Sequence, residues 1–489
     1  MKKTICILLT SLFLISSILM TGCAEKTADT DETTVTTENE ATSVTEEITE
    51  AAETGNLPDV KYNGEEFRIL AQLDGNRHYD VFAEEADNND SVRDAVYQRN
   101  KTVEERFEVK IVVEFDVFSN VNAAIDRMVK SGTDDFDLCF VHMVTGAALA
   151  LDHDFVPFEK LEYIDLSRPW WDQSLKQGFS IGNELFFANG DISPSSFSTT
   201  SCLYFNKKIM ERNDLEYPYE LVKSGKWTLD RFIEYTKDFT RDADGDGKID
   251  PHGASDMFGL TSWAYDVPYS LYYGAGGNLV SKDENDMPYY DPQVERDEQI
   301  YGKIYEAVIT NNAYFESADY NNVGQLFING QAMFYDASLL LADRLRDMND
   351  EFGIIPMPKF DESQKEYRSF VNGASSMVCV PASCQDLQRA SILTEALAEE
   401  AYKTVTPVLY ETYLKRKVSR DADSAEMIDY IIRNRVFDMG YINMFDGIGS
   451  YVRDLLLSKS TNVASTFKSR EKSSKNTIKK MIEAYNSKS

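Results

Sequence analysis

Residues 109–113 (VKIVV) and 137–141 (DLCFV) are two short, mainly apolar runs, and the predicted fold of this chain is built around them. The run at 66–71 (EFRILA) has the same character and precedes them. Apolar residues at helical spacing occupy Ser91 to Phe107 and Val121 to Lys130, so each strand is followed by a helix. Strands separated by helices of this length predict right-handed β-α-β units and a mostly parallel sheet.

A second region with alternating patterns begins near residue 202. Strand patterns occur around 203–205, 332–335 and 352–356. Helical patterns run from Thr228, a candidate N-cap, through Phe239, from 292 to 310, and over most of the chain after Gln385. We find no internal repeat of 20–50 residues. A length of 489 residues predicts two or three domains.

The charge of the chain excludes two classes of partner. Its 50 basic and 82 acidic residues give a net charge of −32. Such a protein would repel a nucleic-acid backbone, and it would not bind an anionic lipid surface through basic patches. The composition, with 43% hydrophobic residues, is that of a folded soluble protein. With only four histidines, a histidine-rich metal centre is not expected.

The N-terminus predicts export. Lys2 and Lys3 precede an apolar run at 5–20, which is shorter than the ~20 residues of an uncleaved membrane anchor. Small residues then precede Cys23, and this stretch resembles a bacterial lipobox. We therefore expect residues 1–22 to be a signal peptide and Cys23 to be the lipidated first residue, carrying acyl chains such as palmitate. The mature protein is expected on the extracellular face of the cell membrane.

Residues 23–55 form a predicted disordered tether. They include ten Thr, ten Asp or Glu and one Lys, with no aromatic residue. Such a segment cannot bury enough apolar surface to offset the entropy of its chain. The tether carries a charge of −9 and the signal +2, so the body from Asn56 onward carries −25.

The cysteines of the body do not form a disulfide framework. We expect Cys139, Cys202, Cys379 and Cys384 to be free and mostly buried. A Cys379–Cys384 disulfide is the alternative in an exported protein.

An Asp-rich segment from 242 to 250 (DADGDGKID) matches the spacing of a calcium-binding loop. Oxygen ligands stand at positions 1, 3, 5 and 9 of the loop, with glycine at position 6. Position 12 has Gly253 where a bidentate Glu is usual, so a remote carboxylate would have to complete the site. The loop would join a helix ending near Arg241 to a strand near Phe258 and play a structural role. The alternative is an acidic turn that binds nothing. The predicted metal residues are Asp242, Asp244, Asp246, Lys248 and Asp250.

The sequence contains no catalytic signature, and no cofactor is required. We find no Gly-x-Ser-x-Gly, no His-Glu-x-x-His and no phosphate-binding loop. Aromatic residues are instead concentrated at 261–274 and 169–172, beside Asp and Gly. Aromatic faces next to carboxylates suit sugars, because the ring stacks while the hydroxyls form hydrogen bonds. Packing in the core is the alternative role for any one of these aromatics.

Several short motifs occur along the chain. Each alone is weak evidence for a protein family, but their order and spacing together are specific. With these motifs, the chain resembles the extracellular solute-binding lipoproteins of ABC importers, in the carbohydrate-binding group that includes maltodextrin-binding proteins. The resemblance covers the body from about residue 62 to the end. Besides the lipobox and the Asp-rich loop, the motifs are RNKTVEERF at 99–107, LYFNKK at 203–208, Trp227-Thr228, GQAMF at 330–334 and GIIPMP at 353–358.

The resemblance implies an α/β, two-lobe periplasmic-binding-protein-like fold of type II, with hinge strands and a helical C-terminal region. The expected crossings between lobes lie at 186–200 and 369–374. Hinge closure would trap the solute and present it to a membrane permease. The expected protein is a monomer and not an enzyme. Lobe 1 would comprise 56–190 plus 372–405, and lobe 2 would comprise 200–370 plus 406–489.

The resemblance also implies a set of ligand-binding positions in the cleft. Ser338 and Leu339 stand where related proteins have a Trp, which departs from the maltodextrin-binding pattern. His142 could instead contact only protein. A neutral sugar is the expected solute, with peptides and polyamines left open. The alternatives are a surface-anchored carbohydrate-active enzyme and a calcium-stabilised adhesion or sensory protein. The predicted ligand residues are Gln72, Asp74, His142, Met143, Asp191, Trp263, Asp266, Tyr335 and Asp336.

Overall fold

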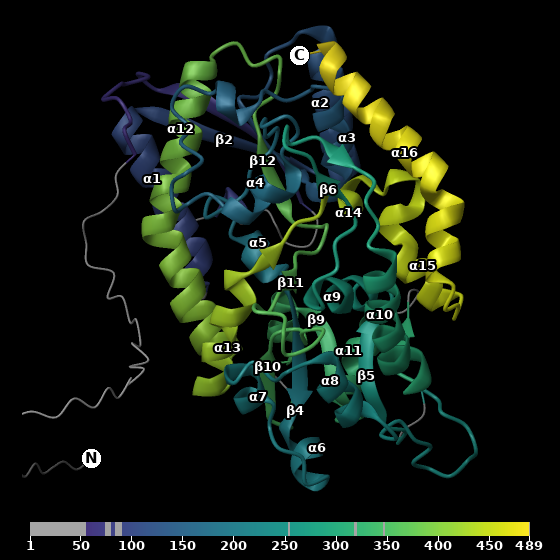
Figure 1. Cartoon of the computed structure of the whole chain (residues 1–489). Coiled ribbons are helices and arrows are strands. Elements are labelled where there is room, and N and C mark those ends of the chain that lie inside the picture. Colours follow the sequence, from purple (N-terminus) through teal and green to yellow (C-terminus); the bar gives the residue numbers. More distant parts are fainter. Residues whose placement is uncertain are drawn as a thin grey trace, which may run out of the picture. The chain divides into compact units, whose positions relative to one another are not determined.

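Two mixed β-sheets organise the computed structural model, which describes residues 55–73, 80–83, 90–252, 255–316, 320–345 and 348–488. The predicted signal peptide, Cys23 and the tether lie outside these residues. Among the described residues, no helix combines the length and the apolar character that crossing a membrane requires. We call the first sheet with its helices lobe 1 and the second sheet with its helices lobe 2 (Figure 1).

Lobe 1 is built on a four-stranded sheet with the order β12-β3-β1-β2. β1 pairs in parallel with β2 and β3, and β12 is antiparallel to β3. The carboxyl ends of β1, β2 and β3 therefore meet at one edge of the sheet. The elements of lobe 1 are β1 (Glu65–Gln72), α1 (Ser91–Phe107), β2 (Val109–Asp116), α2 (Phe118–Ser131), β3 (Leu138–His142), α3 (Met143–Leu151), η2 (Phe158–Lys160), α4 (Gln173–Phe179), β12 (Ser376–Cys379) and α12 (Leu387–Glu400).

Local sequence sets the ends of the helices in lobe 1. The Asp90 side chain caps α1 by accepting hydrogen bonds from the backbone N–H groups of Val92 (3.0 Å) and Arg93 (3.3 Å). Gly132, with φ of 69°, ends α2 in the left-handed conformation, as its sequence position predicts. The bounds of α1 are those predicted from periodicity, because one face of the helix is buried on the sheet.

Lobe 2 is built on a five-stranded sheet with the order β10-β4-β9-β5-β8. β5 is parallel to β9 and β8, whereas β4 is antiparallel to β9 and β10. The elements of lobe 2 are β4 (Ser201–Asn206), α6 (Lys207–Arg212), α7 (Tyr219–Lys223), α8 (Leu229–Thr236), β5 (Phe258–Trp263), α9 (Val267–Gly274), β6 (Ser281–Lys282), β7 (Pro288–Tyr289), α10 (Val294–Tyr305), η3 (Glu306–Thr310), β8 (Tyr314–Glu316), α11 (Tyr320–Ile328), β9 (Ala332–Ser338), η4 (Leu339–Leu345) and β10 (Phe352–Ile355).

Thr228 caps α8 as predicted, since its hydroxyl accepts the backbone N–H of Arg231. The predicted extension of this helix to Phe239 is wrong. The helix ends at Thr236, and Asp238 adopts a φ of 56°. Arg241 instead forms an antiparallel bridge with Met257, which brings the two ends of the Asp-rich loop together.

The chain passes between the two sheets at the predicted crossings. Ala188 bridges to Val378 in lobe 1, and Thr200 bridges to Val371 at the start of β4. The short strands β11 (Ser369–Phe370) and β13 (Arg435–Val436) pair in parallel beside them, and α5 (Ser195–Ser198) lies in the first crossing. Together these segments form the hinge.

The C-terminal region is mostly helical and touches both lobes. In Figure 1, the helix that starts with α12 continues along one side of the molecule to α13, and α16 runs along the opposite side. α14 packs against α3, and α16 packs against both α10 and α3. The elements are η5 (Ala401–Val405), η6 (Val408–Val418), α13 (Ala422–Arg433), α14 (Met439–Asn443), η7 (Phe445–Ser450), α15 (Tyr451–Leu457) and α16 (Val463–Lys488).

All four cysteines of the body are buried and free, which confirms the prediction of reduced thiols over a Cys379–Cys384 disulfide. Cys139 and Cys379 face each other across β3 and β12. Burial raises the pKa of the Cys379 thiol far above its usual value, so this group stays protonated.

Candidate functional site

An aromatic pair stands at the end of β5, where lobe 2 meets the hinge. The rings of Trp263 and Tyr265 lie 4.8 Å apart between centroids. Tyr265 is 41% exposed, which is unusual for a large aromatic side chain and leaves its ring available for contact. The guanidinium of Arg453, a residue of α15, lies 5.2 Å from the centre of the Tyr265 ring. The two rings are tilted by 46° to each other, and the exposed face of Tyr265 is one against which a sugar ring can stack.

Two carboxylates lie directly beside this aromatic pair. Asp336, on β9, is 1% exposed and accepts hydrogen bonds from the hydroxyls of Ser262 (2.9 Å) and Ser270 (2.7 Å). Asp266, at the start of α9, accepts a hydrogen bond from the amide Nδ2 of Asn372 in the hinge at 2.8 Å. These bonds fix the direction of both carboxylates. One oxygen of Asp336, Oδ1, has no hydrogen-bond partner among the described residues.

The electrostatics of this pair disfavour an anionic ligand. Burial raises the pKa of Asp336 to about 6. Burial, and then the neighbouring charge of Asp336, raise the pKa of Asp266 to about 8. Among the described residues, no Lys or Arg forms an ion pair with either group. A ligand that donates hydroxyl or amine hydrogens would satisfy the free acceptor, whereas a second anion would add repulsion.

The edge of lobe 1 contributes a second set of side chains. Gln72 ends β1, is buried, and donates from Nε2 to the Ser376 hydroxyl at 2.9 Å, while its Oε1 has no partner among the described residues. His142 ends β3 and caps α3 by accepting the Thr145 N–H at Nδ1, at 3.4 Å. Its ring lies 5.1 Å from that of Phe118, which follows β2. The parallel strands therefore gather polar and aromatic groups at one edge.

The hinge segment 372–376 joins these two sets of residues. Its first residue, Asn372, bonds to Asp266 of lobe 2. Its last residue, Ser376, pairs with His142 and bonds to Gln72 of lobe 1. Of the predicted residues, Gln72, His142 and Asp266 thus contact this segment of the hinge. Trp263 and Asp336 lie beside Asp266 in lobe 2.

Other predicted ligand residues point elsewhere. Tyr335 and Asp336 are neighbours on a strand, so their side chains lie on opposite faces of the sheet. Tyr335 is 3% exposed and packs against the rings of Tyr204 and Phe327 in the core. Met143 is also buried, at 1% exposure. Asp74 lies outside the described residues.

Asp191, in the first crossing between the lobes, is buried and bonded to another part of the protein. It is 5% exposed and accepts a hydrogen bond from the Thr406 hydroxyl. Burial raises its pKa to about 7. The bond to Thr406 ties the hinge to the long helix that follows α12.

Sequence reasoning missed four residues around the hinge. Tyr265 was part of the aromatic segment, but nothing distinguished it from its buried neighbours. Asn372 lay within a predicted crossing, and its amide could have been recognised as a candidate hydrogen-bond donor. Phe118 and Arg453 carry no signal in the sequence, because their partners are distant along the chain.

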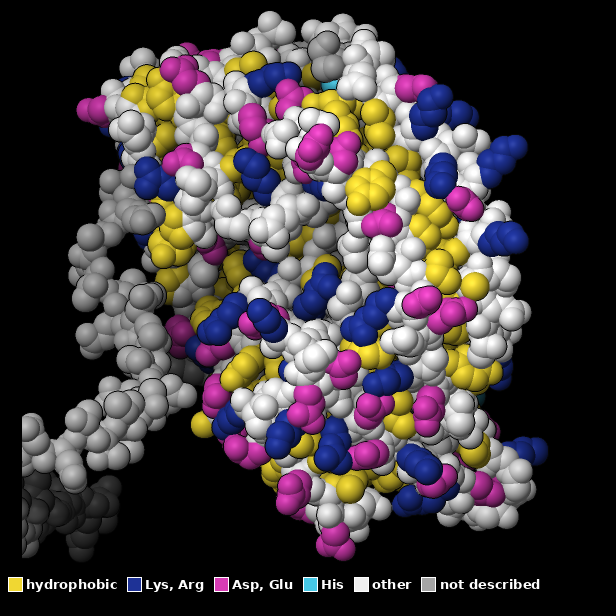
Figure 2. Space-filling model, viewed as in Figure 1, with side chains coloured by type: hydrophobic (Ala, Val, Ile, Leu, Met, Phe, Trp, Pro, Cys, Tyr) yellow, Lys and Arg dark blue, Asp and Glu magenta, His cyan; other side chains and the backbone are white. Residues whose placement is uncertain are grey.

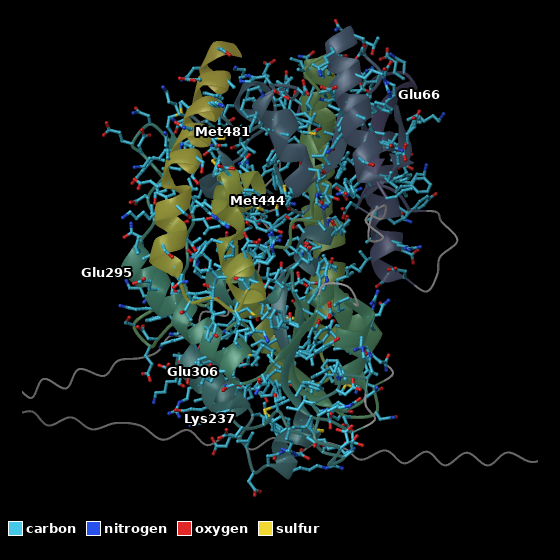
Figure 3. The ribbon with its side chains drawn as sticks, turned by 90° about the vertical axis from the view of Figure 1, so that its right-hand side faces the viewer. Glu66, Lys237, Glu295, Glu306, Met444 and Met481 are labelled. Carbon is cyan, nitrogen blue, oxygen red and sulfur yellow. The ribbon has the colours of Figure 1, made fainter. Side chains whose placement is uncertain are left out.

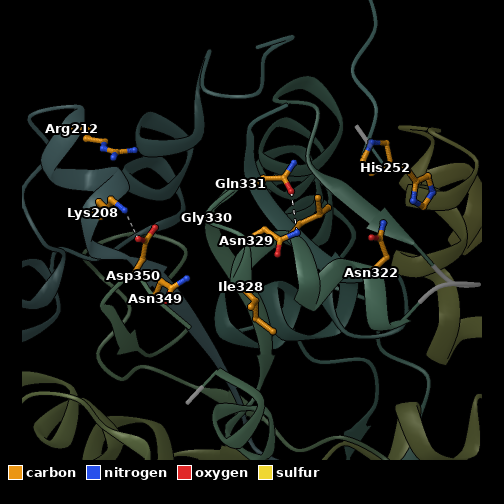
Figure 4. Close-up of a pocket in the computed structure, with 12 residues that line it drawn as sticks. Lys208, Arg212, His252, Asn322, Ile328, Asn329, Gly330, Gln331, Asn349 and Asp350 are labelled. Atoms are coloured by element: carbon orange, nitrogen blue, oxygen red, sulfur yellow. Dashed lines mark hydrogen bonds and ion pairs between the residues drawn. The ribbon is translucent and has the colours of Figure 1, made fainter. Parts of the chain in front are cut away.

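A separate polar groove of about 800 Å³ lies at the opposite edge of the lobe 2 sheet (Figure 4). It opens where β4 ends and β9 begins, and it contains none of the predicted ligand residues. An ion pair of 2.6 Å between Lys208 and Asp350 occupies part of its wall. The hinge differs from this groove, because Gln72 of lobe 1 and Asp336 of lobe 2 each have a buried oxygen there with no hydrogen-bond partner among the described residues.

The Asp-rich loop brings three carboxylates together. Oxygens of Asp242, Asp244 and Asp256 lie within 4.8 Å of one another, whereas the predicted Asp246, Lys248 and Asp250 are not part of this group. Asp256 is 1% exposed, and its two oxygens accept the backbone N–H groups of Ala243 and Asp250. Sequence spacing did not identify Asp256, which lies beyond the twelve positions of a standard loop.

The fold agrees with comparisons to known proteins. A family model described as bacterial extracellular solute-binding protein matches residues 85–390. This chain belongs to the family of bacterial extracellular solute-binding proteins. Membership confirms the expectation of a protein that binds its solute and does not convert it. No curated protein matches the chain.

Solved structures confirm the predicted α/β two-lobe fold. An ABC substrate-binding protein from Listeria monocytogenes in complex with cycloalternan is 13% identical, with a TM-score of 0.52, covering 86% of this chain and 99% of its own. A maltose/maltodextrin-binding domain from Bdellovibrio bacteriovorus bound to maltotriose is 11% identical, with a TM-score of 0.53 and coverage of 86% and 100%. A solute-binding protein from Agrobacterium radiobacter in complex with ribitol is 12% identical, with a TM-score of 0.52 and coverage of 85% and 99%.

Proposed function

We propose that the protein is the substrate-binding component of an ABC importer and that it captures a neutral oligosaccharide at the hinge between its lobes. The observation that carries this proposal is the placement of the Trp263–Tyr265 pair beside Asp266 and Asp336, around a hinge segment that also contacts Gln72 of lobe 1. The aromatic pair supplies a stacking surface, and the carboxylates supply acceptors for sugar hydroxyls.

The character of the site supports a neutral ligand over an anionic one. Asp336, with a pKa of about 6, is ionised at neutral pH and has no ion-pair partner among the described residues, so a further negative charge would be repelled. The structural relatives named above bind cycloalternan, maltotriose and ribitol, which are uncharged polyols. A cationic polyamine is the second candidate, since it would pair with the same two carboxylates.

A thermal-shift screen tests the proposal. Neutral oligosaccharides, a peptide panel and polyamines would each be added to the purified body. A ligand at 100 times its Kd stabilises the folded form by about 2.7 kcal/mol, which raises the melting temperature measurably. We expect at least one oligosaccharide to do so. If only a polyamine or a peptide raised the melting temperature, the sugar assignment would be wrong.

We further propose that Cys23 carries a lipid anchor and that residues 23–55 hold the body at the extracellular face of the membrane. Support comes from the lipobox-like sequence before Cys23 and the family's extracellular role. Cells expressing the Cys23→Ser chain should release the protein into the soluble exported fraction. Continued membrane association of that variant would contradict the anchor. Permease genes beside this gene would favour import, and a sensor-kinase gene would favour a sensory role.

A bound calcium ion is a separate proposal for the Asp-rich loop. Asp242 and Asp244 occupy positions 1 and 3 of the loop, and Asp256 would replace the missing Glu at position 12. Calcium prefers six to eight oxygen ligands of this kind. We expect calcium to raise the melting temperature of the wild type and to leave Asp242→Asn unchanged. An equal effect of calcium on both proteins would contradict this site.

A further inference from the structure

The C-terminal helix α16 carries an excess of positive charge on a chain that is otherwise acidic. Its 26 residues include seven Lys or Arg and two Asp or Glu, a net charge of +5, whereas the whole chain carries −32. The exclusion of anionic partners, which we drew from composition, therefore does not hold at this helix. The positive charge of α16 therefore suits an anionic partner, although the net charge of the whole chain does not.

The basic residues are arranged along one exposed face of α16. The side chains of Val463, Phe467, Ile478, Met481 and Tyr485 are buried and attach the helix to the body. Lysines recur at 468, 472, 475 and 479, spacings of three and four that align them on the solvent side. Figure 2 shows basic side chains gathered along the margin of the molecule where α16 runs in Figure 1.

Only part of this charge is neutralised within the chain. Lys475 pairs with Glu471 at 2.6 Å, and Lys479 pairs with Glu483 at 3.5 Å. Among the described residues, Lys468 and Lys472 have no carboxylate within 4.0 Å. Two lysines are therefore available for an external anion.

A groove lies directly beside this lysine row. It has a volume of about 310 Å³ and runs between the start of α16 and the start of α10. Tyr290, Val294 and Phe467 provide its apolar part, and Lys468 and Lys475 line it together with the acidic Asp291 and Glu471. Tyr289, next to the groove in sequence, is 43% exposed. Figure 3 shows α16, marked by Met481, above Glu295 of α10 and Glu306 at the start of η3.

We propose that the lysine row of α16 and this groove form a docking surface for an acidic peptide segment of a partner protein, with one large apolar side chain of that segment in the groove. Lys468, which has no carboxylate partner among the described residues, would pair with its carboxylates, and Lys475 would share its charge between Glu471 and the peptide. Charge complementarity favours a short segment over an extended anionic surface such as a membrane. A membrane would also face the acidic remainder of the body, whereas a short peptide at the groove meets only the charges near it, which include Asp291 and Glu471 as well as the lysines.

Fluorescence anisotropy with a synthetic probe tests the proposal on the full mature chain. The probe is a short labelled peptide of Asp and Glu around a single Phe. We expect saturable binding that weakens as salt increases. The double variant Lys468→Glu/Lys475→Glu should weaken binding about tenfold or more, and Lys468→Gln/Lys475→Gln should have an intermediate effect. Melting temperatures of both variants verify that they are folded.

The matched control reverses two exposed lysines of lobe 1, Lys110 and Lys130, which also form ion pairs, with Glu66 and Asp126. Lys110→Glu/Lys130→Glu should bind the probe as the wild type does. Equal loss in both double variants would show nonspecific attraction and overturn the proposal. Absence of peptide binding, together with sedimentation of the protein on phosphatidylglycerol vesicles, would assign the surface to a membrane and likewise overturn it.

Discussion

Asp336 should destabilise the protein at neutral pH, and removing its charge should therefore stabilise it. The carboxylate is 1% exposed and receives only two hydroxyl hydrogen bonds. Burial raises its pKa from 3.8 to about 6. Asp336→Asn keeps the shape of the side chain and an acceptor for the two serine hydroxyls, but it cannot ionise.

The sign and size of the effect follow from the linkage between protonation and folding. Below pH 3.8, Asp336 is protonated in both the folded and the unfolded chain, so its raised pKa has no effect. Between pH 3.8 and about 6, the unfolded chain releases its proton first, and stability falls as pH rises. A rise of about two pKa units corresponds to about 3 kcal/mol, an upper bound for the penalty at pH 8.

The assay compares thermal unfolding of wild type and Asp336→Asn at pH 4.5 and pH 8. For a chain of this size, 1 kcal/mol shifts the melting temperature by about 1–2 °C. The variant should therefore gain about 3–6 °C relative to wild type at pH 8, and little at pH 4.5. Asp59→Asn, whose side chain is 94% exposed, serves as the control. An equal difference between variant and wild type at both pH values would refute the reasoning, because a titrating group cannot produce it.

Three further predictions concern other parts of the molecule. Tyr265→Ala should weaken sugar binding by about 1 kcal/mol, or about fivefold, by calorimetric titration, with an unchanged melting temperature because the ring is exposed. A loss of stability equal to that of a core aromatic would contradict its role in binding. Arg435→Ala should cost about 3–5 kcal/mol in denaturant unfolding, because it leaves buried Asp172 unpaired; both side chains are 7% exposed. A cost below about 1 kcal/mol would show that water replaces the partner. Gly190→Ala should prevent folding, because the added Cβ would lie 2.0 Å from the carbonyl oxygen of Trp170. The measurement is the yield of soluble protein, and a normal yield would contradict this prediction.

Local pattern was sufficient to predict much of the fold. The bounds of α1 were correct because Asp90 caps the helix and one apolar face covers the sheet. The order of β1, β2 and β3 with their helices followed from the same periodicity. The end of α8 was misjudged, because Phe239 continues the apolar pattern although Asp238 adopts a left-handed φ. Such a break depends on the neighbouring bridge between Arg241 and Met257, which the sequence does not reveal.

The site was predicted only in part, because its contacts join distant segments. Trp263 and Asp266 were predicted as ligand positions from the family resemblance, within an aromatic segment that the sequence itself marks. Their partner Asn372 lies 106 residues from Asp266, and no local rule links the two. Tyr335 was predicted as a ligand residue beside Asp336. Alternation along a strand places the two side chains on opposite faces of the sheet, and that of Tyr335 packs in the core. Asp256 joins the carboxylates of Asp242 and Asp244 only because the bridge between Arg241 and Met257 brings the two ends of the loop together.

The most direct test of the account asks where a bound sugar sits. Calorimetric titration of the best oligosaccharide from the screen would compare wild type with two double variants: Trp263→Ala/Asp266→Asn at the hinge, and Arg212→Ala/Asn349→Ala in the distal groove of Figure 4. Loss of stacking and of a hydrogen bond, about 2 kcal/mol together, predicts about 30-fold weaker binding by the hinge variant. The groove variant should bind as the wild type does. Retained affinity in the hinge variant, with loss in the groove variant, would contradict the central claim.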